Sequence, residues 1–371
     1  MPVHYHLGQF PPPELNWKQL IPIIGPANAA LARYDGILAA IPNPSVLLTP
    51  LFTHEAVLSS RIEGIQATME EVLEFEAGAD PGRFSEDRKT DIQEILNYRR
   101  AMNHALQLLN ELPLCLRVIK ATHRVLMENV RGMSKSRGEF RRTANWIAPP
   151  GCPIEQARCI PISAEKLPES MSVWEKYLNS NVPDRLVQLA ILHAEFEALH
   201  PFLDGNGRLG RMLVPLFLFN AKLLNSPMFY ISEYFEKNRD IYYEKLLAVS
   251  RDGDWTGWCE FFLEAIVQQA RINQEKASAI LHLYSEKKVQ WIELMRSPFA
   301  IKALDFLFAR PIFSSTDFNK YSGIPSSTAK RFLKILHNSN ILYQIQESRG
   351  QRPAIFGFTE LLKITEERSR L

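Results

Sequence analysis

Hydrophobic residues recur every three or four positions along most of this chain, the spacing that places them on one face of a helix. The pattern therefore predicts a mainly α fold. Proline or glycine follows several of the periodic segments, where either residue can end a helix. The expected helices cover residues 27–40, 47–62, 68–76, 86–110, 113–130, 168–178, 183–199, 210–224, 239–251 and 255–285.

Two regions depart from the helical pattern. Residues 1–27 are rich in proline, which favours an extended arm that lies over the body or is partly mobile. Residues 138–168 also contain several prolines, and short extended runs occur there at 145–148 and 158–162. This combination predicts a loop or a β-hairpin between two helical blocks.

The C-terminal block, from about Ser297, has a different pattern. It predicts three short helices and then two strands, an order that resembles a winged helix-turn-helix. The helices are expected at 299–308, 316–321 and 326–338, and the strands at 342–346 and 355–359.

The chain is thus expected to have three consecutive parts. Residues 1–85 form an N-terminal arm and helical segment, 86–285 a helical core, and 297–371 a winged-helix-like domain. A length of 371 residues fits two or three domains of ordinary size.

Composition excludes several classes of protein. The 43 Lys and Arg nearly balance the 41 Asp and Glu, whereas a protein that binds nucleic acid over its whole surface carries a large basic excess. A hydrophobic content of 46% excludes an acidic disordered chain. The four cysteines form no CxxC pair, so free thiols in a reducing cytosol are expected. No export signal or long apolar run is present, and we expect a cytoplasmic protein without membrane contact.

The net charge of +2 hides an uneven distribution. From Ser297 onward the chain has 11 basic and 6 acidic residues, a balance of +5 that leaves −3 for the rest. Lys330, Arg331 and Lys334 would face outward on the second helix of the helix-turn-helix, where basic side chains suit DNA phosphates. The alternative is a winged helix used for protein contacts or dimerisation. DNA and a second copy of the chain are therefore both candidate partners.

The segment from His200 to Arg211 reads HPFLDGNGRLGR and carries the clearest chemistry. A helix ends at His200 and Pro201, a Gly-Asn-Gly turn follows, and a strongly apolar helix begins directly after it. The turn presents backbone N–H groups at a helix N-terminus, which is a cradle for phosphates. Arg208 and Arg211 are three residues apart, so both can face the same anion.

Two further side chains complete this constellation. Asp204 offers a hard oxygen ligand beside the cradle, as Mg²⁺ on a polyphosphate requires. His200 is the nearby group that could accept a proton near neutral pH. A phosphate cradle, a metal carboxylate and a base within twelve residues indicate transfer of a nucleotide phosphoryl-type group.

The same segment resembles the signature of the Fic family, His-x-Phe-x-(Asp/Glu)-Gly-Asn-Gly-Arg-x-x-Arg, and matches every fixed position. The resemblance implies a helical Fic core that transfers AMP from ATP to a Ser, Thr or Tyr hydroxyl of a protein, which can be the enzyme itself. It makes His200 the general base and Asp204 the Mg²⁺ ligand. The implied ATP-binding residues are Asp204, Gly205, Asn206, Gly207, Arg208, Leu209, Gly210 and Arg211.

Downstream of the signature, Tyr242 and Tyr243 lie where relatives often have aromatic residues near the adenine or ribose; packing in the core is the alternative. Eight residues after Tyr242, some relatives have an Asn that contacts the nucleotide, and this chain has Ser250.

Residues 59–64, SSRIEG, resemble the inhibitory motif of the family, (Ser/Thr)-x-x-x-Glu-(Gly/Asn). The resemblance implies that Glu63 pairs with Arg211 and occupies the place of the ATP γ-phosphate. A carboxylate and a γ-phosphate would then compete for one guanidinium.

Residues 138–168 correspond to the flap of the family, a hairpin that lines the site. A target segment would add to the flap edge as a short strand, so that recognition rests on main-chain pairing. Arg158, Cys159 and Ile160 are the expected flap strand near the nucleotide; a proline-rich loop is the alternative.

The sequence thus predicts a Mg²⁺- and ATP-dependent protein adenylyltransferase that is held in check by Glu63. Two alternatives remain. One is a DNA-binding regulator whose Fic core senses a nucleotide. The other is a Fic enzyme that removes AMP or transfers another phosphate-linked group.

Overall fold

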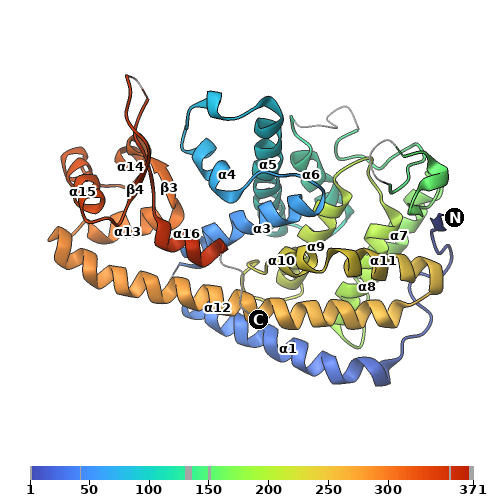
Figure 1. Cartoon of the computed structure of the whole chain (residues 1–371). Helices are drawn as coiled ribbons and strands as arrows, with labels where there is room; N and C mark the ends of the chain where they lie inside the picture. Colours follow the sequence, from blue (N-terminus) through green and yellow to red (C-terminus); the bar gives the residue numbers. More distant parts are fainter. Residues whose placement is uncertain (1, 42, 130–135, 149–151, 351, 367–371) are drawn as a thin grey trace. The chain divides into compact units, whose positions relative to one another are not determined.

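The computed structural model describes residues 2–41, 43–129, 136–148, 152–350 and 352–366. Its elements are mostly helices with two small sheets, so the prediction of a mainly α fold is confirmed (Figure 1). Val130 of one expected helix and residues 149–151 of the expected flap lie outside the described residues. No helix in the described part of the chain is both long and apolar enough to cross a lipid bilayer.

The chain forms two compact units, each assembled from separate stretches. The first contains Met1–Asp35, Leu58–Gly64 and Leu96–Arg271, and the second contains Gly36–Val57, Ile65–Ile95 and Ile272–Leu371. The three consecutive parts expected from the sequence stay a prediction. Four helices contribute residues to both units: α1 (Trp17–Ala40), α3 (Thr49–Ile62), α5 (Glu86–Leu109) and α12 (Trp255–Met295).

Helix α8 (Arg185–Leu199) is the central element of the first unit, and nearly all of its residues are buried. Asp184 caps its start, because one carboxylate oxygen accepts the N–H groups of Leu186 and Val187 at 2.9 Å each. The other helices that lie wholly in this unit are α6 (Leu116–Leu126), α7 (Leu167–Leu178), α9 (Asn206–Asn220), α10 (Ser232–Lys237) and α11 (Arg239–Asp252). Helix α8 packs against α7, α9 and α11 (Figure 1).

A small sheet joins the N-terminal arm to the expected flap. Strand β1 (Val3–His4) pairs in parallel with β2 (Cys159–Ile160), and Ile147 forms an antiparallel bridge with Cys159 on the other side. The hairpin expected at 145–148 and 158–162 is therefore present in a short form. The single turn η2 (Ile154–Gln156) lies within its connection.

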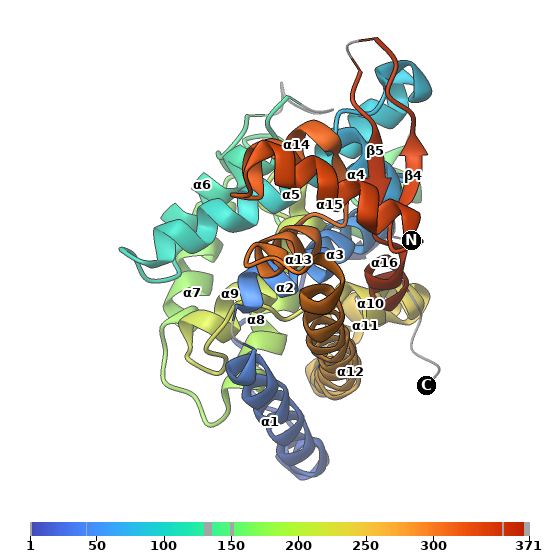
Figure 2. The same ribbon diagram turned by 90° about the vertical axis from the view of Figure 1, so that its left-hand side faces the viewer.

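The second unit contains the C-terminal elements, which Figure 2 shows turned toward the viewer. Its antiparallel sheet has the order β3-β5-β4. The three expected helices lie within one residue of the expected positions, but the sequence missed the helix at Thr359–Glu366. It also missed β3, because a three-residue, fully buried strand shows no alternation. The winged-helix assignment stays a prediction. The elements are α13 (Ala300–Ala309), β3 (Ile312–Ser314), α14 (Ser315–Tyr321), α15 (Ser326–Asn338), β4 (Tyr343–Gln346), β5 (Ile355–Gly357) and α16 (Thr359–Glu366).

The hairpin of β4 and β5 is held by other residues of the second unit, which also includes α2 (Pro44–Leu47), α4 (Met69–Glu76) and η1 (Pro81–Arg83). The hydroxyl of Tyr343 donates to Glu70 at 2.9 Å, and Arg352 forms an ion pair with Asp80. This hairpin is the expected wing, and one of its basic residues is therefore already paired.

Candidate active site

The signature segment is a tight loop between α8 and α9. Helix α8 ends at His200, whose φ of 47° is in the left-handed region. Gly205 begins α9 with a φ of 76°, and a Cβ at this position would lie 2.8 Å from the sulfur of Met127. Glycine is therefore required at 205 by both the backbone angle and the space.

Asn206 closes this loop. Its side-chain oxygen accepts the N–H of Phe202 at 2.9 Å, and its side-chain nitrogen donates to the carbonyl of Phe202 at 2.8 Å. The sequence predicted a phosphate contact for Asn206. Because the side-chain amide of Asn206 is bonded inside the loop, a phosphate would have to contact its backbone N–H instead. Leu209 is likewise a core residue with no exposed surface.

His123, on α6, supports the loop from outside and was missed in the sequence. Its Nδ1 accepts the N–H of Gly138 at 2.9 Å, so the proton is on Nε2, which donates to the carbonyl of Asp204 at 3.0 Å. The ring stacks on Phe202 with centroids 3.8 Å apart. Burial lowers the pKa of His123 to about 4, which keeps the ring neutral.

Arg141 holds the end of α8. Its guanidinium is buried and donates to four carbonyls, including those of Leu199 and His200 at 3.3 and 2.9 Å. The backbone N–H of Arg141 also donates to the carbonyl of Pro201 at 2.9 Å. The last carbonyls of a helix carry partial negative charge, so they stabilise this cation. The same bonds hold His200 in its left-handed conformation, which costs about 1 kcal/mol in a residue with a Cβ.

A cavity of about 650 Å³ lies between α8, α9, α11, the flap and the end of α3, all within the first unit. Six other residues that were expected at the site do not line this cavity: Gly205, Asn206, Arg208, Leu209, Gly210 and Ile160. The predicted site residues that do line it are Glu63, Arg158, Cys159, His200, Asp204, Gly207, Arg211, Tyr242 and Tyr243.

Arg211 and Glu63 form an ion pair in this cavity. The Nη2 atom of Arg211 lies 2.7 Å from Oε1 of Glu63, and the guanidinium also donates to the hydroxyl and carbonyl of Ser59. The Arg211 side chain is 1% exposed and that of Glu63 is 36% exposed. A Cβ on Gly207 would lie 2.2 Å from Oε1 of Glu63, so glycine at 207 lets the carboxylate approach the first turn of α9.

Two sequence profiles match the chain over more than half of its length. The Fic/DOC family N-terminal profile matches residues 21–107, and the Fic/DOC family profile matches residues 113–218. The chain belongs to the Fic/DOC family.

Known proteins resemble this Fic chain at low identity. A protein adenylyltransferase Fic from Drosophila grimshawi is 27% identical over 175 residues, which are 46% of this chain and about a third (32%) of that relative. A Fic family protein from Desulfovibrio desulfuricans G20 has a TM-score of 0.61 at 21% identity, over 94% of this chain and 98% of that one. A Fic domain containing signaling protein from Bacteroides thetaiotaomicron VPI-5482 has a TM-score of 0.52 at 17% identity, over 68% and 97%. These two structures show that the fold is shared.

Burial and charge set the protonation of this Fic site. Burial lowers the pKa of His200 to about 4, although the carboxylate of Glu63 acts in the opposite direction, so the ring is neutral near pH 7. For Glu63, burial acts to raise the pKa, but the nearby guanidinium of Arg211 lowers it by more. The pKa of Glu63 therefore lies below its usual value. The site therefore combines a neutral imidazole with a carboxylate–guanidinium pair.

Glu197 and His193 of α8 lie close enough to Arg211 to interact with its charge. Glu197 lines the cavity, and burial raises its pKa to about 7. Nδ1 of His193 faces the carbonyl of Gly210 at 3.1 Å, so the other ring nitrogen accepts the hydroxyl of Tyr242 at 2.9 Å. Tyr242 is 1% exposed and stacks on Phe235, so it is a core residue that also reaches the cavity.

We predict that Arg141→Lys lowers the free energy of unfolding by about 3 kcal/mol, because lysine cannot replace several charge-assisted bonds to buried carbonyls. Denaturant unfolding measures the change. The control is Arg142→Lys, which alters an exposed neighbour and should change stability by less than about 0.5 kcal/mol. Equal stability of the two variants would contradict the role of Arg141.

We also predict that His200 stays neutral from pH 8 down to about pH 5.5. Its pKa is depressed, so protonation occurs only as the pH falls toward about 4. Removal of Glu63 deletes a carboxylate that raises this pKa, so Glu63→Gly shifts the midpoint further down. NMR of the imidazole nitrogens measures the titration, with His200→Asn to assign the signal. A midpoint near 6.5 would show that the ring is not desolvated.

Proposed function

We propose that this Fic protein transfers AMP from ATP to a hydroxyl group of a protein, including its own chain, and that Glu63 restrains the reaction. The observation that carries the proposal is the Glu63–Arg211 pair, which lies in the same cavity as His200 and the start of α9. A buried cation, a helix N-terminus and a neutral imidazole are the groups that in-line transfer of a nucleotide requires.

In this reaction the hydroxyl oxygen of the target attacks the α-phosphorus of ATP. A new P–O bond forms, the bond to pyrophosphate breaks, and the proton of the hydroxyl passes to His200. A neutral imidazole can accept that proton, and burial keeps the ring of His200 neutral near pH 7. Arg211 would stabilise charge on the departing phosphates once Glu63 has moved.

Asp204 fits a magnesium ion that arrives with the nucleotide. It lines the cavity, and one carboxylate oxygen accepts the N–H of Gly205 at 2.7 Å, which orients the group. No cluster of three or more His, Cys, Asp or Glu that could bind a metal occurs among the described residues, and Mg²⁺ commonly uses one or two carboxylates plus phosphates and water. When bound, the ion would neutralise charge on the phosphates.

Among the residues that the structure describes, no strand pairs with the outer edge of the flap segment around Ile147. Ile147 directs its N–H and C=O toward β2, so those of Trp146 and Ala148 point to the opposite side. The other edge of β2 is occupied by β1. We propose that an extended target segment pairs with the edge of Trp146 and Ala148, and that the exposed indole of Trp146 contacts it.

We predict that Glu63→Gly raises incorporation of α-³²P-labelled ATP into protein by about tenfold or more, because one charge-assisted bond no longer competes for Arg211. Wild type and variant are incubated with Mg²⁺, a cell lysate and labelled ATP. Adding His200→Ala to this variant should abolish the labelling while ATP still binds. The labelled proteins are then identified by mass spectrometry.

The matched control is Glu111→Gly, which removes an exposed glutamate that also follows the end of a helix. It should label like wild type. Equal labelling by Glu63→Gly and Glu111→Gly would refute restraint by Glu63. Release of AMP from a labelled target by wild type, without labelling by either variant, would instead favour the AMP-removing alternative.

A second candidate function is DNA binding by the C-terminal elements. The observation that favours DNA binding is a group of three exposed basic residues on α15: Lys330, Arg331 and Lys334. Arg352 of the adjacent hairpin is paired with Asp80, so α15 would supply the main contacts.

We predict that alanine at Lys330, Arg331 and Lys334 weakens binding to duplex DNA and reduces the slope of log affinity against log salt by about 2 to 3. Gel shifts at several salt concentrations measure both. The control is Lys288→Ala with Lys363→Ala, which removes exposed basic residues elsewhere in the same unit. Binding that is absent, or that no salt concentration alters, would leave α15 as a surface for protein contacts.

A further inference from the structure

The N-terminal arm contains a buried polar cluster that the proposed chemistry does not use. The ring of His6 is almost fully buried, with Nε2 2.8 Å from Oε2 of Glu195 and Nδ1 2.8 Å from the hydroxyl oxygen of Ser250. The hydroxyl of Tyr5 donates to Oε1 of Glu195 at 2.6 Å. Both carboxylate oxygens of Glu195 are therefore bonded to the arm.

The arm is attached to three walls of the candidate active-site cavity. Glu195 belongs to α8 and Ser250 to α11, and Ser250 itself lines the cavity. The third wall is β2, whose Arg158 and Ile160 carbonyls accept the N–H groups of Val3 and Tyr5 at 3.1 and 3.0 Å. A strand of two residues is too short to be stable alone, so β1 supplies main-chain bonds that hold it.

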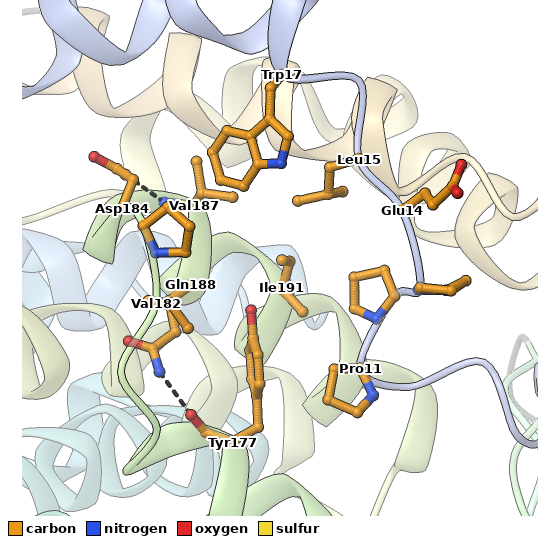
Figure 3. A pocket seen from close by; sticks show the side chains of 13 residues that line it. Pro11, Glu14, Leu15, Trp17, Tyr177, Val182, Asp184, Val187, Gln188 and Ile191 are labelled. Carbon is orange, nitrogen blue, oxygen red and sulfur yellow. Dashed lines mark hydrogen bonds between the residues drawn. The ribbon is translucent and has the colours of Figure 1, made fainter.

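The buried polar contacts of the arm are at residues 3–6, and the proline-rich part that follows makes ring contacts and exposed hydrogen bonds. Figure 3 shows that part, where Leu15 and Trp17 face Val187 and Ile191 across a second cavity of about 400 Å³. Phe10, at the start of this part, lies edge-on to Tyr177 with ring centroids 5.3 Å apart, and Asn16 donates its N–H to the hydroxyl oxygen of Thr256 at 3.1 Å. Glu195, by contrast, would be a buried carboxylate without a partner if the arm left, which is strongly unfavourable.

We propose that the N-terminal arm is part of the nucleotide site and that His6 is a positioning residue, which holds Ser250 and the flap strand β2 in the geometry that binds ATP. The inference rests on the proposed function, because it names ATP as the occupant of the cavity. It assigns to Tyr5 and His6 a role that is separate from the signature and from Glu63.

The test uses the full chain carrying Glu63→Gly, with ATP affinity measured by calorimetry and AMP transfer measured for KM and kcat. His6→Ala should raise the Kd and KM for ATP by about tenfold, as the loss of one to two charge-assisted bonds predicts, with kcat changed less than about twofold. His6→Gln, which keeps a donor toward Glu195, should recover part of the affinity. The control is His4→Ala, because His4 is exposed on the same strand.

A double-mutant cycle separates positioning from general loss of stability. If His6 acts through Ser250, the effects of His6→Ala and Ser250→Ala on ATP affinity should be less than additive. Thermal unfolding shows whether each variant is folded at the assay temperature, and His6→Gln replaces His6→Ala in the cycle if the alanine variant is not. Equal ATP affinity of the His6 and His4 variants, both folded, would overturn the proposal.

A parent protein that binds no ATP would refute the proposed function instead. The arm is then judged by amide hydrogen exchange of peptides that cover residues 158–162 and 246–252. Exchange in these peptides should be faster in the His6 variant and unchanged in His4→Ala. Identical exchange in the two variants would show that the arm does not hold these walls.

Discussion

The buried guanidinium of Arg211 is the group around which the candidate site is organised. A cation in the protein interior costs several kcal/mol unless a counter-charge and hydrogen-bond acceptors accompany it. Ser59 and Glu63, at the end of α3, supply both. The same requirement can be met by an anion from outside the protein. Under the proposed function, the carboxylate of Glu63 and a phosphate of the nucleotide would compete for this one cation.

Burial also determines what the histidines can do. His200 and His123 both have a lowered pKa, because desolvation disfavours the imidazolium form, yet their partners give them different roles. His123 is held between Gly138 and Asp204 and supports the loop. His200 lines the cavity, where a neutral ring can accept a proton. The same physical effect thus gives one structural histidine and one candidate base.

Helix α8 carries much of the site, and side chains from outside the helix hold it in place. Arg141 binds the carbonyls at its C-terminus, and the arm residues Tyr5 and His6 bind Glu195 in its second half. Each contact pairs a buried charge with partners from a distant part of the chain. Such pairs are costly to break from one side, so they fix the loop and the flap strand relative to α8.

The local structure of residues 200–211 could be predicted from the sequence, because a helix end, a glycine turn and two arginines on one helical turn are local features. Most helices could be predicted for the same reason, and α15 begins and ends at the expected residues. The pairing of Glu63 with Arg211 was predicted only through a resemblance, and the structure contains that contact. Strand β3 was missed because it is too short to show a pattern.

The partners of buried polar side chains could not be predicted in this way. Asn206 bonds to Phe202 inside the loop. His123 reaches Asp204, Arg141 reaches His200 and His6 reaches Ser250 across 81, 59 and 244 residues of sequence, respectively. Periodicity reports whether a residue faces the core, but it carries no information on which remote group it meets there. Local spacing therefore determined the helices and the glycine turn between α8 and α9. The folded path of the chain decided how His200 is held, what restrains Arg211 and which segment completes the flap.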